Sequence, residues 1–166
     1  MVIVIMGVAG CGKTTVGSRV ASQLGLPFYD GDDFHPASNV ALMKAGIPLG
    51  DEERRLWLET LAAKIIEWNS TGGAVLACSA LKESYRKVLR GSDTSGIRFV
   101  HLTGSEELIA ERMRRRTGHY MPVDLLESQF AALEVPSDAI TVSVDQAREQ
   151  VVRNIIDGLK EQNAVF

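Results

Sequence analysis

The sequence predicts a three-layer α/β/α fold in which helices cover both faces of a parallel five-stranded sheet. Short apolar runs alternate with helical stretches along the 166 residues, a rhythm typical of parallel strands joined by crossover helices. The first run, residues 2–6, is apolar throughout, as expected of a strand buried on both faces. No internal repeat or linker rich in proline and serine divides the sequence, so we expect a single domain over residues 1–166.

Each expected element has its own signal. After the first strand, Val16, Val20 and Leu24 recur at helical spacing and Gly25 follows, which predicts a helix over residues 13–24. The other predicted strands are the apolar runs at residues 27–29, 74–78, 97–102 and 139–142. The other predicted helices cover about residues 36–45, 51–68, 81–90, 105–116, 123–133 and 145–160.

Composition and charge limit the partners. Hydrophobic residues make up 45% of the chain and charged residues 23%, which suits a globular domain with a core. Because the net charge is −3, we expect no nucleic acid partner and a small ligand whose anionic groups are held by local cations. Two cysteines form no disulfide framework, and the apolar residues 1–6 are too short for a signal or spanning segment. We therefore expect a cytoplasmic protein without membrane attachment.

Residues 7–14 fit a phosphate-binding pattern of glycine, four residues, glycine, lysine and a hydroxyl residue, placed between the first strand and the first helix. The glycines let backbone N–H groups converge on a phosphate, and the helix N-terminus adds positive potential. Lys13 can bridge the outer phosphates and Thr14 can ligate magnesium. We therefore expect a P-loop NTPase fold with nucleotide contacts from Gly7, Val8, Ala9, Gly10, Cys11, Gly12, Lys13, Thr14 and Thr15.

The P-loop alone would suit a GTPase, an ATPase or a kinase. The sequence lacks the guanine-reading segment Asn-Lys-x-Asp, and 166 residues are too few for the switch and effector regions of a mechanical ATPase. We therefore predict a small kinase that uses ATP with Mg²⁺. A nucleotide-binding regulator that has lost turnover is the alternative from another class.

Three carboxylates and a histidine follow the second predicted strand, namely Asp30, Asp32, Asp33 and His35. The carboxyl ends of parallel strands are where such sheets bind ligands. Two carboxylates two residues apart can divide the work, so we assign Asp30 to magnesium, through water, and Asp32 to the attacking hydroxyl of an acceptor. A polar turn that caps the next helix would also explain Asp33 and His35.

Two basic segments are candidates for binding anions. Arg54 and Arg55 lie near the start of the helix predicted from residue 51, and one of them could hold an acceptor carboxylate bidentately, although solvated arginines are common at such positions. The helix predicted over residues 105–116 ends in a run of arginines that includes Arg112 and Arg116. In a phosphoryl-transfer enzyme such a segment forms a lid whose arginines neutralise the transferring phosphate, whereas a basic, solvated helix end is the alternative.

Several segments match, in order, the motifs of one family. They are residues 6–15; residues 30–36 with Asn39; residues 46–49 followed by Asp51; Arg54, Trp57 and Leu58; residues 78–82 with Tyr85 and Arg86; residues 118–121; and Leu125, Leu126, residues 128–130, Leu133 and Glu134. Together they resemble the bacterial-type gluconate kinase (gluconokinase) family, within the shikimate- and adenylate-kinase-like P-loop proteins. The resemblance covers nearly the whole chain and departs at Leu56, where the family often has proline.

The resemblance implies an ATP-dependent 6-phosphorylation of D-gluconate by a homodimer, with a substrate-binding segment at about residues 30–57 and a lid at about residues 112–130. It implies that the acceptor is bound by Asp32, His35, Arg54, Lys82, Arg116 and His119, and that catalysis depends on Lys13, Asp32 and Arg116. It also implies that magnesium is bound by Thr14 and Asp30, and that the nucleotide is contacted by Arg112 and Asp145. Arg116 is chosen among neighbouring arginines by its spacing to His119, and the adenine loop around Asp145 rests on analogy. The nearest alternative acceptor is another small hydroxy acid, such as shikimate.

Overall fold

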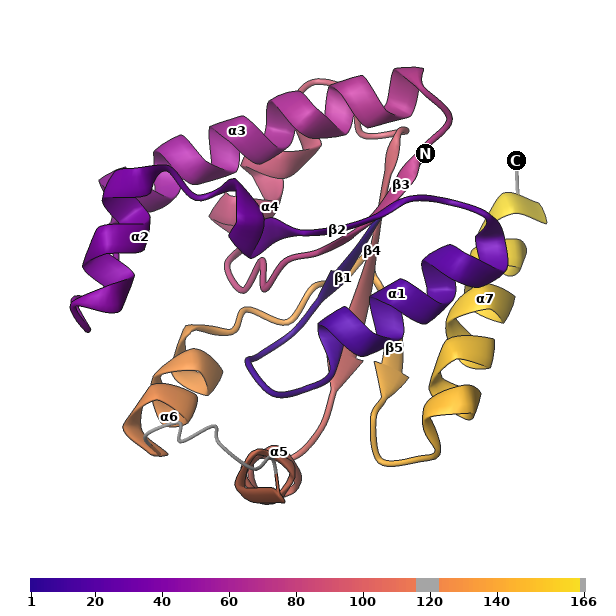
Figure 1. Ribbon diagram of the computed structural model, residues 1–166. Helices are drawn as coiled ribbons and strands as arrows, with labels where there is room; N and C mark the ends of the chain where they lie inside the picture. The colour runs from indigo at the N-terminus through magenta and orange to yellow at the C-terminus, as the bar shows by residue number, and fades with distance from the viewer. Residues whose placement is uncertain (116–122, 165–166) are drawn as a thin grey trace.

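Five parallel strands form one sheet in the order β2-β3-β1-β4-β5 (Figure 1). The computed structural model describes residues 1–115 and 123–164. The strands are β1 (Val2–Met6), β2 (Phe28–Asp30), β3 (Ala74–Ala77), β4 (Ile97–Thr103) and β5 (Ile140–Ser143). The predicted parallel five-stranded sheet is therefore confirmed, and the bounds of every predicted strand lie within one residue of those observed.

The described helices are α1 (Lys13–Leu24), α2 (Ala37–Lys44), α3 (Asp51–Ser70), α4 (Glu83–Arg90), α5 (Glu106–Arg115), α6 (Val123–Ala132) and α7 (Arg148–Ala164). Two of them, α4 and α7, begin more than one residue later than predicted. Lys82 is extended, which delays α4, and the Ser143 hydroxyl and carbonyl hold a turn that delays α7. Residues 31–34 were expected as loop, but they form the short 3-10 helix η1 (Gly31–Phe34), because the Asp30 side chain caps it.

Strand β1 lies at the centre of the sheet and is buried on both faces. Because successive side chains of a strand point to opposite faces, Ile3 and Ile5 join the core beneath α1 and α7, whereas Val2, Val4 and Met6 join the core beneath α3 and α4. All five side chains are completely inaccessible to solvent. Burial on both sides is why this strand reads as a continuous apolar run rather than an alternating one.

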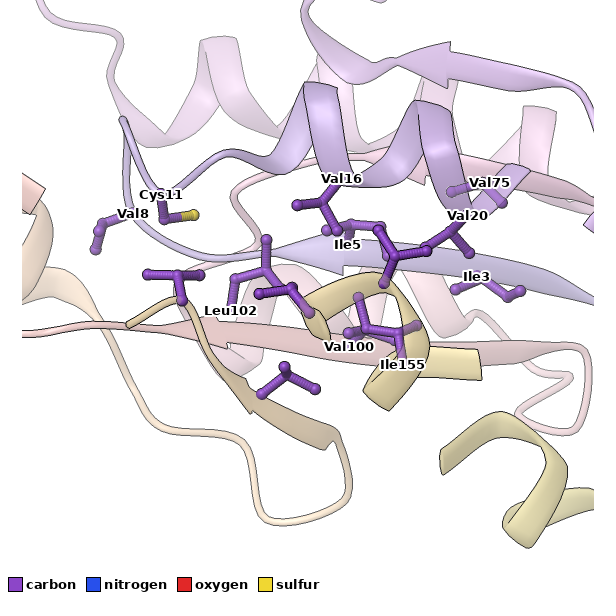
Figure 2. Close-up of a cluster of buried hydrophobic side chains, with 14 of the residues drawn as sticks. Ile3, Ile5, Val8, Cys11, Val16, Val20, Val75, Val100, Leu102 and Ile155 are labelled. Atoms are coloured by element: carbon purple, nitrogen blue, oxygen red, sulfur yellow. The ribbon is translucent and has the colours of Figure 1, made fainter. Parts of the chain in front are cut away.

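The core beneath α1 and α7 also extends to the helices beside the P-loop. Figure 2 shows Val16 and Val20 of α1 above the sheet, with Ile155 of α7 near Val100 of β4. Ile109 of α5 and Leu126 of α6 belong to the same cluster of buried residues. These two helices are therefore held by core packing as well as by their loops.

Parallel pairing places the carboxyl ends of all five strands at one edge of the sheet. At that edge β1 continues into the P-loop, β2 ends at Asp30, and β5 leads to Val144. Residues far apart in the sequence are thus gathered where the site was predicted. No helix in residues 1–115 or 123–164 combines the length and apolar character that crossing a membrane requires.

Arg86 of α4 holds the turn that follows β3. Its side chain is buried, and its guanidinium donates to the carbonyls of Ala80 at 2.7 Å, Leu81 at 3.1 Å and Glu134 at 2.8 Å. Its Nε also pairs with the Glu83 carboxylate at 3.0 Å. Ala80 has a φ of 45°, a left-handed conformation that costs energy for a residue with a Cβ. Arg86 therefore fixes a strained turn that presents Lys82 to the site.

Replacing Arg86 with methionine should destabilise the fold by about 3–5 kcal/mol, because three carbonyls and Glu83 lose a buried donor. For a chain of this size that loss lowers Tm by about 6–20 °C, measurable by thermal unfolding. The matched control is Arg55→Met, which removes an exposed arginine paired with two glutamates and should leave Tm close to wild type. Equal shifts in the two variants would contradict the structural role of Arg86.

Candidate active site

The P-loop connects β1 to α1, as predicted. Gly10 and Gly12 have φ values of 80° and 97°, which glycine adopts without steric cost. Met113 of α5 lies against the loop, since a Cβ added to Gly10 would stand 2.6 Å from Met113 Cγ. Lys13 Nζ donates to the Val8 carbonyl at 3.0 Å, so its ammonium group lies over the loop that is expected to cradle phosphates.

A cavity of about 380 Å³ lies beside the P-loop. Val144 and Gln146, on either side of Asp145, help to line it, which is where the sequence predicts the adenine contact. Arg112 lines it too and donates to the Val144 carbonyl, which ties α5 to the loop after β5. The full lining is Gly10, Cys11, Gly12, Val16, Arg112, Arg115, Val144, Gln146, Arg148 and Val151.

Arg148 is a cavity residue that the sequence reasoning missed. It is the first residue of α7, a position where acidic residues are usual because they complement the helix dipole. A cation at the start of the helix that follows the predicted adenine loop was the signal that could have found it. Its place in the lining suits contact with an anionic ligand.

Asp30 connects the nucleotide side of the site to the acceptor side. Its Oδ2 accepts a hydrogen bond from the Thr14 hydroxyl at 3.1 Å, and its Oδ1 accepts one from the backbone N–H of Asp32 at 3.0 Å. The structure therefore brings together the two residues predicted for magnesium, Thr14 and Asp30. The same carboxylate sets Asp32 on the first turn of η1.

A magnesium ion fits these residues. The described residues contain no group of three or more His, Cys, Asp or Glu side chains that could hold a metal ion. Mg²⁺ in nucleotide sites needs only one or two protein ligands, since phosphates and water complete its coordination. A hydroxyl and a carboxylate in contact, as in Thr14 and Asp30, are the oxygen ligands it prefers.

The Asp32 side chain is open to an incoming ligand, being 77% exposed. Desolvation and then the negative charge of Asp30 raise the pKa of Asp32, while His35 and Lys13 act in the opposite direction. The rise is limited because most of the side chain still meets water. A raised pKa makes Asp32 a stronger proton acceptor than an ordinary aspartate.

Trp57 of α3 fixes the position of η1 from the buried side. Its indole Nε1 donates to the Gly31 carbonyl at 2.8 Å. A Cβ on Gly31 would stand 2.9 Å from the Ala77 carbonyl, so the first residue of η1 packs directly on the end of β3. This close packing limits movement of the acidic turn.

His35 is packed beside Asp32 rather than open to solvent. Its ring stacks on Trp57 with centroids 4.4 Å apart, and its side chain is only 5% exposed. Burial lowers the pKa of His35, although the charge of Asp32 opposes this, so the ring is neutral near neutral pH. The Asn39 amide nitrogen lies 3.3 Å from Nδ1, which makes Nδ1 the acceptor and leaves the proton on Nε2, 3.9 Å from Asp32 Oδ1.

Two cations lie beside the Tyr85 side chain. Arg54 donates to the Tyr85 hydroxyl at 3.3 Å, and its guanidinium carbon lies 5.9 Å from the Tyr85 ring centroid. Lys82 Nζ lies 5.7 Å from the same centroid. Within the described residues neither Arg54 nor Lys82 pairs with a carboxylate. The sequence reasoning named both cations and quoted Tyr85 within a motif, but it gave Tyr85 no role beside them.

Two predicted residues, Arg116 and His119, lie outside the described residues. Of the predicted lid, the structure describes α5 as far as Arg115, and α6. Arg115 pairs with Glu111 at 2.6 Å and its side chain is 76% exposed. Arg112 is thus the predicted lid arginine that the structure places, and it lies beside the nucleotide cavity.

Known proteins share this fold and sequence. The family model described as shikimate kinase matches residues 9–160. A solved structure of shikimate kinase from Aquifex aeolicus is 24% identical with a TM-score of 0.65, and it covers 99% of each chain. At that identity the likeness shows the fold alone, and it confirms the predicted shikimate-kinase-like architecture.

More similar relatives carry a narrower name. A gluconokinase from Gluconobacter oxydans is 47% identical over 158 residues, covering 93% of this chain and 88% of its own. The thermosensitive gluconokinase of Escherichia coli is 49% identical over 136 residues, covering 80% and 71%. The crystal structure of a gluconokinase from Sinorhizobium meliloti has a TM-score of 0.86 at 45% identity, covering 96% and 91%. The chain therefore belongs to the gluconokinase family of P-loop kinases.

Proposed function

We propose that the protein transfers the terminal phosphoryl group of ATP to the 6-hydroxyl group of D-gluconate. The choice of gluconate as acceptor rests on one observation. The cations Arg54 and Lys82 lie beside Tyr85, and no described carboxylate neutralises them. Gluconate offers a carboxylate to these cations and hydroxyl groups to Asp32 and His35. The relatives named gluconokinase support the same acceptor.

The side chains have separate parts in the reaction. The 6-hydroxyl gives its proton to Asp32 as its oxygen bonds to the terminal phosphorus of ATP, and the bond from that phosphorus to the oxygen of ADP breaks. Lys13 neutralises charge on the outer phosphates. His35, with its proton on Nε2, donates to Asp32 or to a hydroxyl of the acceptor. Magnesium held by Thr14 and Asp30 supplies further charge neutralisation when bound.

We also propose the larger organisation that the resemblance implies. Residues 30–57 form the substrate-binding segment and residues 112–130 form the lid, with Arg116 at the transferring phosphate and His119 near the acceptor. The protein acts as a cytoplasmic homodimer. Lid closure would exclude water, so that ATP is not hydrolysed without an acceptor.

The direct test is ADP release by purified protein with Mg-ATP, measured in a coupled assay. Gluconate should give release well above the background without acceptor, and shikimate, glucose and glycerate should not. Preference for another of these acceptors would keep the kinase and reject the proposed substrate. ATP binding without release on any acceptor would favour a nucleotide-binding regulator.

Asp32→Asn should lower kcat by about 10²–10⁴-fold while ATP binding persists, because the variant keeps the shape of Asp32 but loses its base. In wild type, kcat/KM should fall as pH drops through the pKa of Asp32, and that fall should begin at a higher pH than for an ordinary aspartate, since the pKa is raised. The variant should lack this fall.

The matched control is Asp33→Asn, which neutralises the neighbouring exposed carboxylate of η1. It should retain kcat within a few-fold and keep the acid limb of the pH profile. Near-normal turnover by Asp32→Asn, or an unchanged acid limb in that variant, would show that Asp32 is not the base.

A further inference from the structure

Gln129 of α6 makes a contact with the P-loop that the proposed mechanism does not use. Its side-chain oxygen Oε1 accepts a hydrogen bond from the backbone N–H of Ala9 at 2.6 Å, across 120 positions of sequence. Backbone N–H groups of a P-loop are its phosphate donors. The neutral amide oxygen of Gln129 therefore occupies one N–H of the loop that is expected to cradle phosphates.

Gln129 and Lys13 hold the same peptide unit from opposite ends. The carbonyl of Val8 accepts from Lys13 Nζ at 3.0 Å, and the N–H of Ala9, in the same peptide, donates to Gln129. A trans peptide is planar, so its C=O and N–H point in opposite directions. The orientation of this part of the loop is fixed jointly by the phosphate-binding lysine and by a residue of α6.

The position of Ala9 indicates which phosphate is involved. The cavity on the nucleoside side is lined by Gly10, Cys11 and Gly12, which follow Ala9 in the loop. Ala9 instead adjoins the peptide on which Lys13 rests, and the P-loop lysine reaches the outer phosphates. The N–H that Gln129 occupies thus belongs to the end of the loop nearest the transferred group.

Contacts of Glu134, just after the C-terminal end of α6, anchor the helix that carries Gln129. The Glu134 N–H donates to the Leu81 carbonyl at 2.8 Å, and the Glu134 carbonyl accepts from buried Arg86 at 2.8 Å. Leu126 is buried in the core. Met113 of α5, the helix that precedes residues 116–122 in the sequence, packs closely against Gly10 of the P-loop. Both helices that flank those residues therefore rest on neighbouring P-loop residues.

We propose that Gln129 is a positioning residue whose hydrogen bond to the P-loop depends on the terminal phosphate of the nucleotide. Its oxygen and an oxygen of the terminal phosphate compete for the Ala9 N–H, and the anionic oxygen is the stronger acceptor. Binding of the terminal phosphate thereby changes the contact between the P-loop and α6, a helix of the proposed lid. This rests on the ATP site of the proposed function but not on the identity of the acceptor.

The test compares Gln129→Glu and Gln129→Met with wild type by calorimetric binding of Mg-ADP and of a non-hydrolysable Mg-ATP analogue. The carboxylate of Gln129→Glu should compete with and repel the terminal phosphate, weakening the analogue by about tenfold or more and ADP by less than about threefold. Gln129→Met frees the Ala9 N–H and should tighten the analogue by about 2–10-fold, with ADP nearly unchanged.

Ala131→Glu is the matched control, since it adds the same charge two residues away, at an exposed position of α6 outside the proposed lid. It should leave both affinities within about twofold of wild type. If both Gln129 variants change the affinities for the analogue and for ADP equally, or change neither affinity, then Gln129 has only a structural role and the proposal is wrong. A wild-type protein that binds neither nucleotide would overturn the proposed function as well.

Discussion

The carboxylate of Asp30 joins the two halves of the site, because its oxygens accept hydrogen bonds from different halves. The Asp30 Oδ2 atom accepts from the Thr14 hydroxyl at the start of α1, and Oδ1 accepts from the Asp32 backbone N–H in η1. The parallel order of β2, β3 and β1 brings these segments to one edge of the sheet. Trp57 then holds η1 from the buried side through Gly31. The spacing between the P-loop and the proposed base Asp32 is thus set by contacts within the protein itself.

The partners of four basic residues distinguish those with a structural role from those proposed to bind the acceptor. Arg86 is buried and its guanidinium is used by backbone carbonyls and Glu83. Arg55 is exposed and paired with two glutamates. Arg54 and Lys82 share Tyr85 and, among the residues described, have no carboxylate. Two cations held close together repel one another, and an anionic ligand removes that cost. The pattern of pairing, rather than the number of basic residues, is what supports the acceptor site proposed above.

The sequence predicted the strands well, because strands buried on both faces read as plain apolar runs, as in residues 2–6. It also placed Lys13, Thr14, Asp30 and Asp32 at the carboxyl edge of the sheet, since these residues follow β1 or lie at the end of β2. It missed η1, because its cap depends on a side chain accepting a local backbone N–H. It missed the roles of Tyr85 and Gln129, since their contacts span 31 and 120 positions and leave no periodic signal. Arg116 and His119 stay predictions.

In the proposed reaction, Arg54 and Lys82 hold the acid group of the acceptor while Asp32 faces its hydroxyl. The most direct measurement is steady-state kinetics of Arg54→Ala beside Arg55→Ala, its neighbour on α3. Loss of a charged contact to the acceptor should raise the gluconate KM by about 10–100-fold in Arg54→Ala, with the ATP KM within about twofold of wild type and Arg55→Ala unchanged in both. An equal rise of both KM values in Arg54→Ala, or no rise in either, would contradict the account.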